Sequence, residues 1–347
     1  MIRILIAEDS GVVAMLLKAI FEQEADFEVV GHAKNGEEAV RLAEELRPDL
    51  ITMDIRMPKM DGFEATREIM SSSPIPIVVI SSSVDDEELR ITFRAIEEGA
   101  LAVIEKPRGI GHPDFEAIRR DLVGTIRGMA EVKLVRRRRH PARHEPRPAT
   151  APARPSRGGC RLIAIGASTG GPQALRHIVS ALPRELPVPV VAVQHIGGGF
   201  LGGLVEWLAG FSGPQVRLAR HGETLTPGTI YFAPESRHLC VDSVNGSLVA
   251  LLRDSEPVHG VRPSVDPLFD SVAESCKGEA IGVLLSGMGE DGAEGLLAMR
   301  KAGCRTYVQD RESCVVFGMP GAAMEREAVQ EALALDGICE RLNACGG

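Results

Sequence analysis

A serine in a glycine-rich turn is the first place in this sequence where chemistry is expected. Ser168 lies in the segment 165–171, which reads Ile-Gly-Ala-Ser-Thr-Gly-Gly. The apolar run Leu162–Ile165 precedes it, and a helical pattern follows from Pro172 to Ala181. A serine at a strand-to-helix turn exposes its hydroxyl beside free helix N–H groups, which suits a nucleophile or an anion contact. An N-cap serine would look the same, so this segment alone does not establish catalysis.

Two further polar residues follow predicted strands in the same half of the chain. The run Pro187–Val193 ends at Gln194-His195, and the run Ala280–Leu285 leads into a glycine-rich loop that contains Asp291. Residues at the ends of parallel strands can converge. Together the three side chains would form a triad, in which the histidine takes the serine proton and the carboxylate orients the imidazole.

Each member of this set has another interpretation. His195 alone fits a hydrogen-bonded loop histidine, and Asp291 alone fits an N-cap for a helix predicted over Gly292–Lys301. The order Ser, His, Asp also differs from that of α/β-hydrolases, although Gly-x-Ser-x-Gly matches their nucleophile turn. The other histidines that compete for the role of base are His177, His221, His238 and His259.

A second polar set follows the predicted strands of the N-terminal part. Its members are Glu8-Asp9 after the first strand, Asp54 after the third, Ser81 at the end of the fourth and Lys106 after the fifth. Three converging carboxylates repel one another unless a hard divalent cation such as Mg²⁺ lies among them. The lysine and the hydroxyl could bind phosphoryl oxygens, with Asp54 as the acceptor. A solvated loop explains any one of the acids, but it explains the whole set poorly.

Strand-like runs alternate with helical patterns around these N-terminal residues. The runs are Ile2–Ala7, Glu28–Ala33, Leu50–Met53, Ile77–Ile80 and Leu101–Ile104. The helical patterns are Gly11–Glu24, Gly36–Leu46, Gly62–Met70, Asp86–Glu98 and Asp114–Met129. Five β-α repeats predict a doubly wound parallel sheet with its chemistry at the carboxyl ends of the strands. We assign this (βα)5 domain to residues 1–129.

The C-terminal part, residues 161–347, also alternates strands and helices. We predict a second doubly wound α/β domain, mainly parallel with some antiparallel strands, in which Thr229–Ala233 and Leu239–Asp242 form a hairpin. Between the domains, the segment 130–160 has nine Lys/Arg against two Glu and contains five prolines. This composition predicts a flexible basic linker, although a basic run can also contact nucleic acid or acidic lipid.

Composition limits the remaining possibilities. The 347 residues carry a net charge of −9, which argues against nucleic-acid binding by the chain as a whole. The seven cysteines include no C-x-x-C pair, so we expect free thiols in a reducing cytoplasm. No apolar run approaches the ~20 residues of a membrane span, so we expect no membrane insertion.

The N-terminal domain resembles the receiver domains of two-component response regulators. The matching residues are Glu8-Asp9-Ser10, the segment 54–62, Ser81 and Lys106-Pro107. The resemblance implies that a histidine kinase phosphorylates Asp54 in the presence of Mg²⁺. It implies these roles: Asp9, Asp54 and the backbone carbonyl of Arg56 bind the ion, Glu8 binds it through water, and Ser81 and Lys106 contact the phosphoryl group. The domain departs from the family at Val103, where a switching aromatic residue is common.

The C-terminal domain resembles the bacterial chemotaxis protein-glutamate methylesterases. The matching residues include the segment 165–171, Gln194-His195, Gly222-Glu223, the segments 231–234 and 262–266, the segment 287–293, Gln309-Asp310 and the segment 318–320. The chain departs from the family in the loop 196–200 after His195, and at His221.

This second resemblance implies a phosphorylation-regulated esterase. Ser168 would be the nucleophile, His195 the general base and Asp291 its orienting acid, and the backbone N–H of Met288 would stabilise the oxyanion. The substrates would be glutamyl γ-methyl esters on chemoreceptors, with deamidation of glutamine as a second activity and no cofactor in this domain. Two alternatives stay open: a signalling hydrolase with another substrate, and a regulator without enzyme activity whose linker touches nucleic acid.

Overall fold

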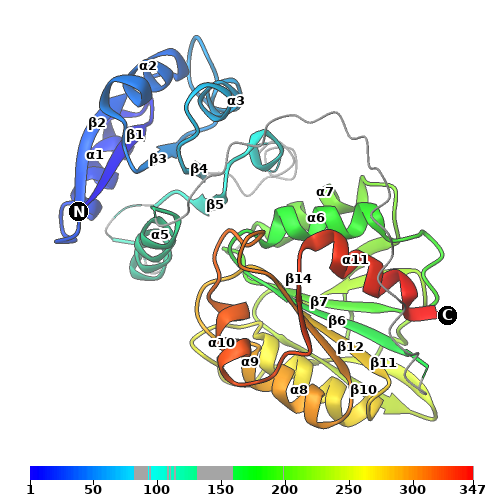
Figure 1. The fold of residues 1–347 in the computed structure, drawn as a ribbon. Helices are drawn as coiled ribbons and strands as arrows, with labels where there is room; N and C mark the ends of the chain where they lie inside the picture. The colour runs from blue at the N-terminus through cyan, green and yellow to red at the C-terminus, as the bar shows by residue number, and fades with distance from the viewer. Residues whose placement is uncertain are drawn as a thin grey trace.

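The computed structural model describes residues 1–81, 93, 95–107, 109, 111–112, 115–130, 159–197 and 199–346, which form two α/β domains (Figure 1). Most of the predicted linker 130–160 and much of the predicted helix 86–98 lie outside these residues. Within the latter, residues 95–98 are helical.

The N-terminal domain is a five-stranded parallel sheet in the order β2-β1-β3-β4-β5. Its strands are β1 (Ile2–Ala7), β2 (Phe27–Ala33), β3 (Leu50–Met53), β4 (Ile77–Ser81) and β5 (Ala102–Glu105). Its described helices are α1 (Gly11–Phe21), α2 (Gly36–Leu46), α3 (Gly62–Ser72) and α5 (Phe115–Ala130). The predicted doubly wound fold of this domain is confirmed.

Helix starts in this domain follow from cap residues that are visible in the sequence. Ser10, Asn35 and Asp61 each precede a helix and accept a hydrogen bond from the backbone N–H three residues further on, at 3.5, 3.0 and 2.8 Å. Each side chain thereby satisfies one of the free N–H groups at its helix start. The chain therefore leaves each strand end through a loop that carries polar residues.

The C-terminal domain is built on a seven-stranded sheet in the order β14-β13-β12-β6-β7-β9-β8, in which every neighbouring pair is parallel. Its strands are β6 (Leu162–Ala167), β7 (Val190–Gln194), β8 (Gln215–Leu218), β9 (Thr229–Phe232), β12 (Ala280–Leu284), β13 (Arg305–Gln309) and β14 (Glu331–Leu333). Its helices are α6 (Gly171–Ala181), α7 (Leu201–Ala209), α8 (Val265–Cys276), α9 (Ala293–Lys301), α10 (Met319–Glu325) and α11 (Leu335–Asn343), followed by the 3-10 turn η1 (Ala344–Gly346).

The predicted fold of this domain, mainly parallel with some antiparallel strands, is confirmed, but the antiparallel strands pair differently from the prediction. A separate two-stranded hairpin joins β10 (His238–Val244) to β11 (Ser247–Arg253). The predicted hairpin between Thr229–Ala233 and Leu239–Asp242 is wrong, because β9 pairs in parallel with β7 and β8 inside the main sheet. All four residues of β9 are buried, as expected of a strand inside a covered sheet.

The two domains contact each other through α6 and α7, which lie on the side of the C-terminal sheet that faces the N-terminal domain (Figure 1). The indole of Trp207 on α7 stacks on Phe93, with ring centroids 5.5 Å apart, and donates a hydrogen bond to Glu97 at 2.9 Å. Gln173 on α6 donates one to the carbonyl of Ala100 at 2.8 Å. The contact therefore combines an aromatic stack with directional bonds.

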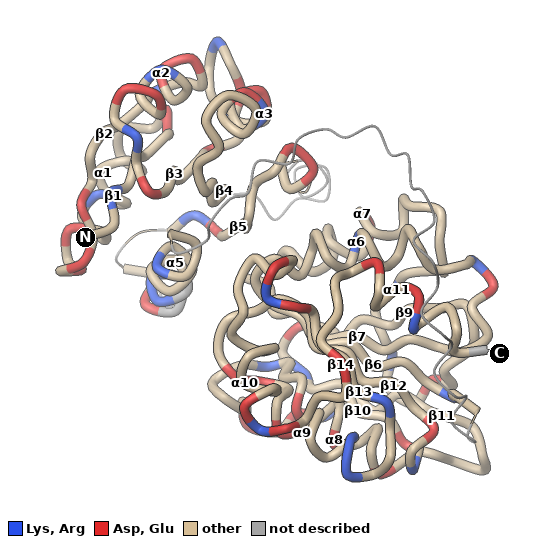
Figure 2. Tube along the Cα trace, in the orientation of Figure 1, with Lys and Arg blue, Asp and Glu red and all other residues tan. Residues whose placement is uncertain are grey.

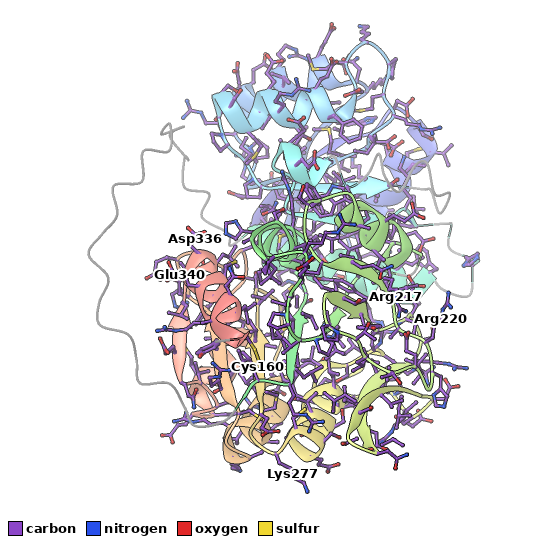
Figure 3. All side chains as sticks on the ribbon, turned by 90° about the vertical axis from the view of Figure 1, so that its right-hand side faces the viewer. Cys160, Arg217, Arg220, Lys277, Asp336 and Glu340 are labelled. Carbon is purple, nitrogen blue, oxygen red and sulfur yellow. A yellow bond between two sulfur atoms is a disulfide. The ribbon has the colours of Figure 1, made fainter. Side chains whose placement is uncertain are left out.

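A disulfide joins Cys160, labelled in Figure 3, to Cys345 at the other end of the C-terminal domain. The expectation of free thiols is wrong for this pair. The two residues are 185 positions apart, so no local cysteine spacing could reveal the bond. The fold brings them together because η1 lies beside the start of β6. The other five cysteines are free.

Acidic and basic segments are interspersed along both domains in the described part of the chain (Figure 2). None of the helices in the described residues is long and apolar enough to span a membrane.

Candidate phosphorylation site and hydrolytic site

The N-terminal domain gathers its predicted polar set at the carboxyl edge of its sheet. Glu8 and Asp54 follow β1 and β3 and are buried, while Asp9 is exposed. Ser81 ends β4 and pairs in register with Glu105 of β5, which places it beside the start of the Lys106 loop. The strand ends thus bring together the residues that the sequence predicted there.

One lysine serves two carboxylates in this cluster. Lys106 Nζ lies 2.8 Å from Glu8 Oε2 and 2.9 Å from Asp54 Oδ2. Burial raises the pKa of both acids, and the shared lysine offsets only part of this effect. Burial by itself lowers the pKa of Lys106, but its bonds to the two acids outweigh burial and raise it. Burial therefore decides the pKa shift of the two acids, but not that of the lysine. The lysine has two anionic partners, whereas the acids share one cation.

The cluster fits a magnesium ion. Glu8, Asp9 and Asp54 each offer a carboxylate oxygen, and these oxygens lie within 4.8 Å of one another. Oxygen ligands with room for water are what Mg²⁺ prefers. Arg56 follows Asp54 by two residues, so its backbone carbonyl lies in the same loop as Asp54. The residues present therefore suit the ion that the sequence analysis predicted.

Ser168 lies in a tight turn between β6 and α6. Gly170 precedes the helix with φ 79°, a left-handed conformation that favours glycine, and the Ser168 carbonyl accepts hydrogen bonds from Gly171 N and Gln194 Nε2, both at 2.8 Å. Gly287, in the loop after β12, lies opposite Ser168: a Cβ atom added to this glycine would lie 2.7 Å from Ser168 Cβ. The turn and the loop after β12 therefore meet closely, with Met288 next in that loop.

The structure also brings His195 and Asp291 together. His195 Nε2 lies 2.8 Å from Asp291 Oδ2, at ion-pair distance but without the alignment of a hydrogen bond. In the described part of the chain, no hydrogen bond joins the Ser168 hydroxyl to His195. Catalytic hydrogen bonds are often loose in structures without substrate. The site thus has its histidine–carboxylate pair assembled, with the serine on the adjoining strand end.

Asp291 does not cap the helix that follows it. Gly292 is the N-cap of α9, without a side-chain bond. The Asp291 carboxylate instead accepts hydrogen bonds at the start of α8, from the Ser264 hydroxyl at 2.6 Å, Val265 N at 2.7 Å and Asp266 N at 3.2 Å. Burial alone would raise the pKa of Asp291, but the adjacent His195 and the hydrogen bonds from Ser264 and Val265 together lower it. The carboxylate is therefore held ionised at the start of another helix.

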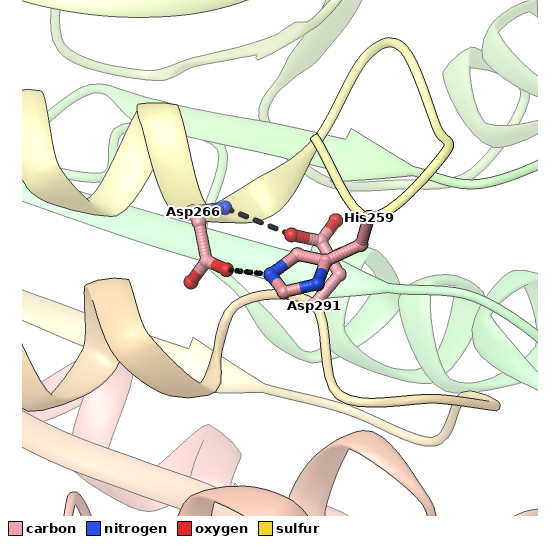
Figure 4. A group of neighbouring side chains, drawn as sticks. All are labelled: His259, Asp266 and Asp291. Atoms are coloured by element: carbon pink, nitrogen blue, oxygen red, sulfur yellow. Dashed lines mark hydrogen bonds and ion pairs between the residues drawn. The ribbon is translucent and has the colours of Figure 1, made fainter. Parts of the chain in front are cut away.

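A second histidine–carboxylate pair, which the sequence analysis missed, lies next to Asp291. Figure 4 shows His259 against Asp266, with Nε2 2.9 Å from Oδ2. Burial raises the pKa of Asp266, and the nearby Asp291 charge raises it further. The signal for this pair was the segment 262–266, which carried part of the family resemblance but received no role.

The competing histidines are committed elsewhere. Their partners are Asp336 for His177, Leu252 N for His221, Ser264 N and Glu256 O for His238, and Asp266 for His259. Of the five histidines considered, only His195 faces both Asp291 and the pocket that contains Ser168.

That pocket, about 520 Å³ in volume, lies between the two domains. Ser168 and His195 line it from the C-terminal domain, and Val103 and Glu105 line it from β5 of the N-terminal domain. Nearby, a side chain at Gly128 of α5 would lie 2.7 Å from Met288 Sδ. The N-terminal domain therefore forms one wall of the candidate hydrolytic site.

Comparisons with known proteins match both halves of the chain. Family models match it as a CheB methylesterase over residues 163–342 and as a response regulator receiver domain over residues 4–112. A protein-glutamate methylesterase/protein-glutamine glutaminase of Methanospirillum hungatei is 47% identical over 326 residues, covering 93% of this chain and 92% of the relative. One from Anaeromyxobacter dehalogenans is 46% identical over 342 residues, covering 99% of this chain and 98% of the relative. The crystal structure of the Thermotoga maritima CheB methylesterase catalytic domain aligns with a TM-score of 0.52 and 38% identity, over 54% of this chain and 98% of that one.

Proposed function

The chain belongs to the CheB methylesterase family and carries a receiver domain, and from this premise we propose that it hydrolyses glutamyl γ-methyl esters on chemoreceptors. The same chemistry would deamidate receptor glutamine, the second activity in the names of its relatives. The observation that carries the proposal is the 2.8 Å approach of His195 to Asp291 in the pocket that Ser168 lines.

The residues would divide the reaction between them. Ser168 Oγ attacks the ester carbonyl while His195 takes its proton, and Asp291 steadies the imidazolium. The backbone N–H of Met288 stabilises the oxyanion, since the loop that carries it lies against Ser168. Methanol leaves with the proton from His195. Water then attacks the acyl-serine through the same base, releasing glutamate and restoring the hydroxyl.

We propose that Asp54 receives a phosphoryl group from a chemotaxis histidine kinase. Glu8, Asp9, Asp54 and the Arg56 carbonyl would hold Mg²⁺, which neutralises charge on the incoming phosphoryl oxygens. Lys106, already 2.9 Å from Asp54, would shift to the phosphoryl group, and Ser81 would donate to it. Because aspartyl phosphorylation draws on ATP through a kinase, we place the protein in the cytoplasm. We expect it to bind no DNA and to insert in no membrane.

Phosphorylation of Asp54 would regulate the hydrolytic site through the N-terminal domain, which forms one wall of the pocket. The added charge of about −1.5 to −2 at Asp54 would disfavour the present arrangement of β5 and α5. Those elements line the pocket and contact the Met288 loop, so loosening them would admit the receptor helix.

The decisive experiment measures labelled methanol released from methyl-labelled receptor membranes, with and without a small phosphodonor. We expect release by the wild type, faster release with phosphodonor, and release slower by about three orders of magnitude or more in Ser168→Ala. Wild-type protein that binds these membranes but releases no methanol would overturn the proposed substrate.

A further inference from the structure

The hydroxyl of Ser264 is completely buried and donates a 2.6 Å hydrogen bond to Asp291 Oδ1. We propose that Ser264 is a positioning residue of the hydrolytic site, which holds Asp291 in the orientation that presents its other oxygen to His195. The proposal rests on the function proposed above and adds a fourth residue to Ser168, His195 and Asp291.

The first argument is that Ser264 gives up the bond its position normally makes. It is the N-cap of α8, with extended backbone angles, yet its side chain caps nothing on that helix. Ser10, by comparison, is an N-cap serine whose hydroxyl accepts from its own helix. At α8 the Asp291 carboxylate accepts the helix N–H groups of Val265 and Asp266, which frees the Ser264 hydroxyl to act as a donor. A serine with only a helix-starting role would keep its own cap.

The second argument is that Ser264 is fixed from behind. Its backbone N–H donates to His238 Nδ1 at 3.1 Å, and His238 is fully buried. Because Nδ1 accepts, the ring proton must be on Nε2, which lies 3.1 Å from the Glu256 carbonyl. Both ring nitrogens are thus committed to backbone partners. The donor that reaches Asp291 has little freedom to move.

The third argument concerns the neighbouring acid. The Asp266 carboxylate accepts from Gly295 N at 2.7 Å. Its other oxygen meets His259, as Figure 4 shows. The Ser264 hydroxyl therefore serves Asp291 alone. The two oxygens of Asp291 have different partners: Oδ1 accepts from the Ser264 hydroxyl and Asp266 N, and Oδ2 accepts from Val265 N and faces His195.

A matched pair of variants tests this role. Ser264→Ala removes the donor to Asp291. Ser271→Ala removes another buried hydroxyl, within α8, that donates to Leu268 O and accepts from Val241 N, away from the site. Both should lower thermal stability. Only Ser264→Ala should lower kcat for methanol release, by about 10- to 100-fold, with KM nearly unchanged.

The pH profile supplies a readout that lost packing would not move. The titratable groups close to Asp291 are His195, Asp266 and His259, and Glu290 lies 3.9 Å from His259 Nδ1. Without the Ser264 donor, the Asp291 carboxylate becomes more basic, so the His195–Asp291 pair holds its proton more tightly. The acid limb of the pH–rate profile should therefore move to higher pH in Ser264→Ala and stay in place in Ser271→Ala.

A double-mutant cycle completes the test, with the rate of Ser168 labelling by a fluorophosphonate probe as a second readout that is independent of the ester. If Ser264 acts through Asp291, adding Ser264→Ala to Asp291→Asn should cost little more. Additive losses, or equal kcat in Ser264→Ala and wild type, would overturn the proposal.

If Ser264→Ala does not fold, Ser264→Cys takes its place, because cysteine keeps a similar volume but is a weaker hydrogen-bond donor. An unchanged kcat in Ser264→Cys would then overturn the proposal. Slower probe labelling of Ser264→Ala would support the positioning role even if no methanol is released by the wild type.

Discussion

Asp54 and Asp291 are two buried aspartates at the ends of parallel strands, and the protein treats them in opposite ways. Asp54 shares one lysine with Glu8, and burial leaves its pKa raised. Asp291 accepts from a hydroxyl and two helix N–H groups and faces an imidazole, and its pKa is lowered. The difference matches their proposed tasks. An acid that must bind a cation and attack phosphorus is left with its charge poorly compensated, whereas one that only orients another residue has its charge stabilised by several donors.

The largest effect should come from the nucleophile beside Asp291. Ser168→Ala should lower methanol release by about three orders of magnitude or more, since the other triad members cannot replace the lost oxygen. Asp54 should still accept phosphate from a small phosphodonor, as measured by radiolabel incorporation. Loss of labelling in this variant would show that the two sites are not separable.

The two aspartates themselves can be exchanged for asparagine. Asp291→Asn should lower kcat by about 10³- to 10⁴-fold because the amide no longer stabilises the imidazolium. Asp54→Asn should keep the basal rate and lose the response to phosphodonor, an effect of about 5- to 150-fold if the coupling is of ordinary size. Methanol release with and without phosphodonor measures both. A large basal loss in Asp54→Asn would break the comparison.

Chelation of divalent cations should affect only one of the sites. With EDTA present, phosphorylation of Asp54 should stop, because its cluster of carboxylates lacks a cation. Basal ester hydrolysis should continue, since Asp291 obtains its charge stabilisation from protein groups. Parallel assays of phosphate incorporation and methanol release test this, and a drop in basal hydrolysis would point to a metal at the second site.

The smallest effect is on stability without added Mg²⁺. The raised pKa of Asp54 means that its ionised form destabilises the fold at neutral pH, and this cost disappears as pH falls through that pKa. The lowered pKa of Asp291 contributes stability above its unfolded pKa, which is lost as pH falls through the folded one. Asp54→Asn should therefore raise Tm and Asp291→Asn lower it, each by about 2–4 °C per kcal/mol. Calorimetry at neutral pH decides, and shifts of the same sign would contradict the comparison.

The sequence was sufficient for the parts of the fold that local pattern determines. Apolar runs predicted β1, β3 and β6 closely, and polar residues at strand ends predicted both clusters, because parallel strands bring their carboxyl ends to one edge. Pairing was harder. The sequence of residues 229–232 contains no signal that distinguishes a strand inside the main sheet from a strand of a hairpin.

Hydrogen bonds between residues far apart in the sequence were not predicted. Asp291 looked like a cap for the next helix, whereas it binds the start of α8, 25 to 27 residues earlier in the chain. The roles of Ser264 and Asp266 follow only from that exchange. The Cys160–Cys345 bond likewise depends on residues near the start and the end of the C-terminal domain meeting.

Trp207 has a consequence of a different kind. It is the only tryptophan in the chain, and it lies in the contact between the domains, stacked on Phe93 and bonded to Glu97. Its indole is therefore the sole chromophore excited at the red edge of aromatic absorption. The colour and yield of its emission depend on whether the ring is covered or hydrated. Intrinsic tryptophan fluorescence should therefore report separation of the two domains without an added dye and without signal from other tryptophans.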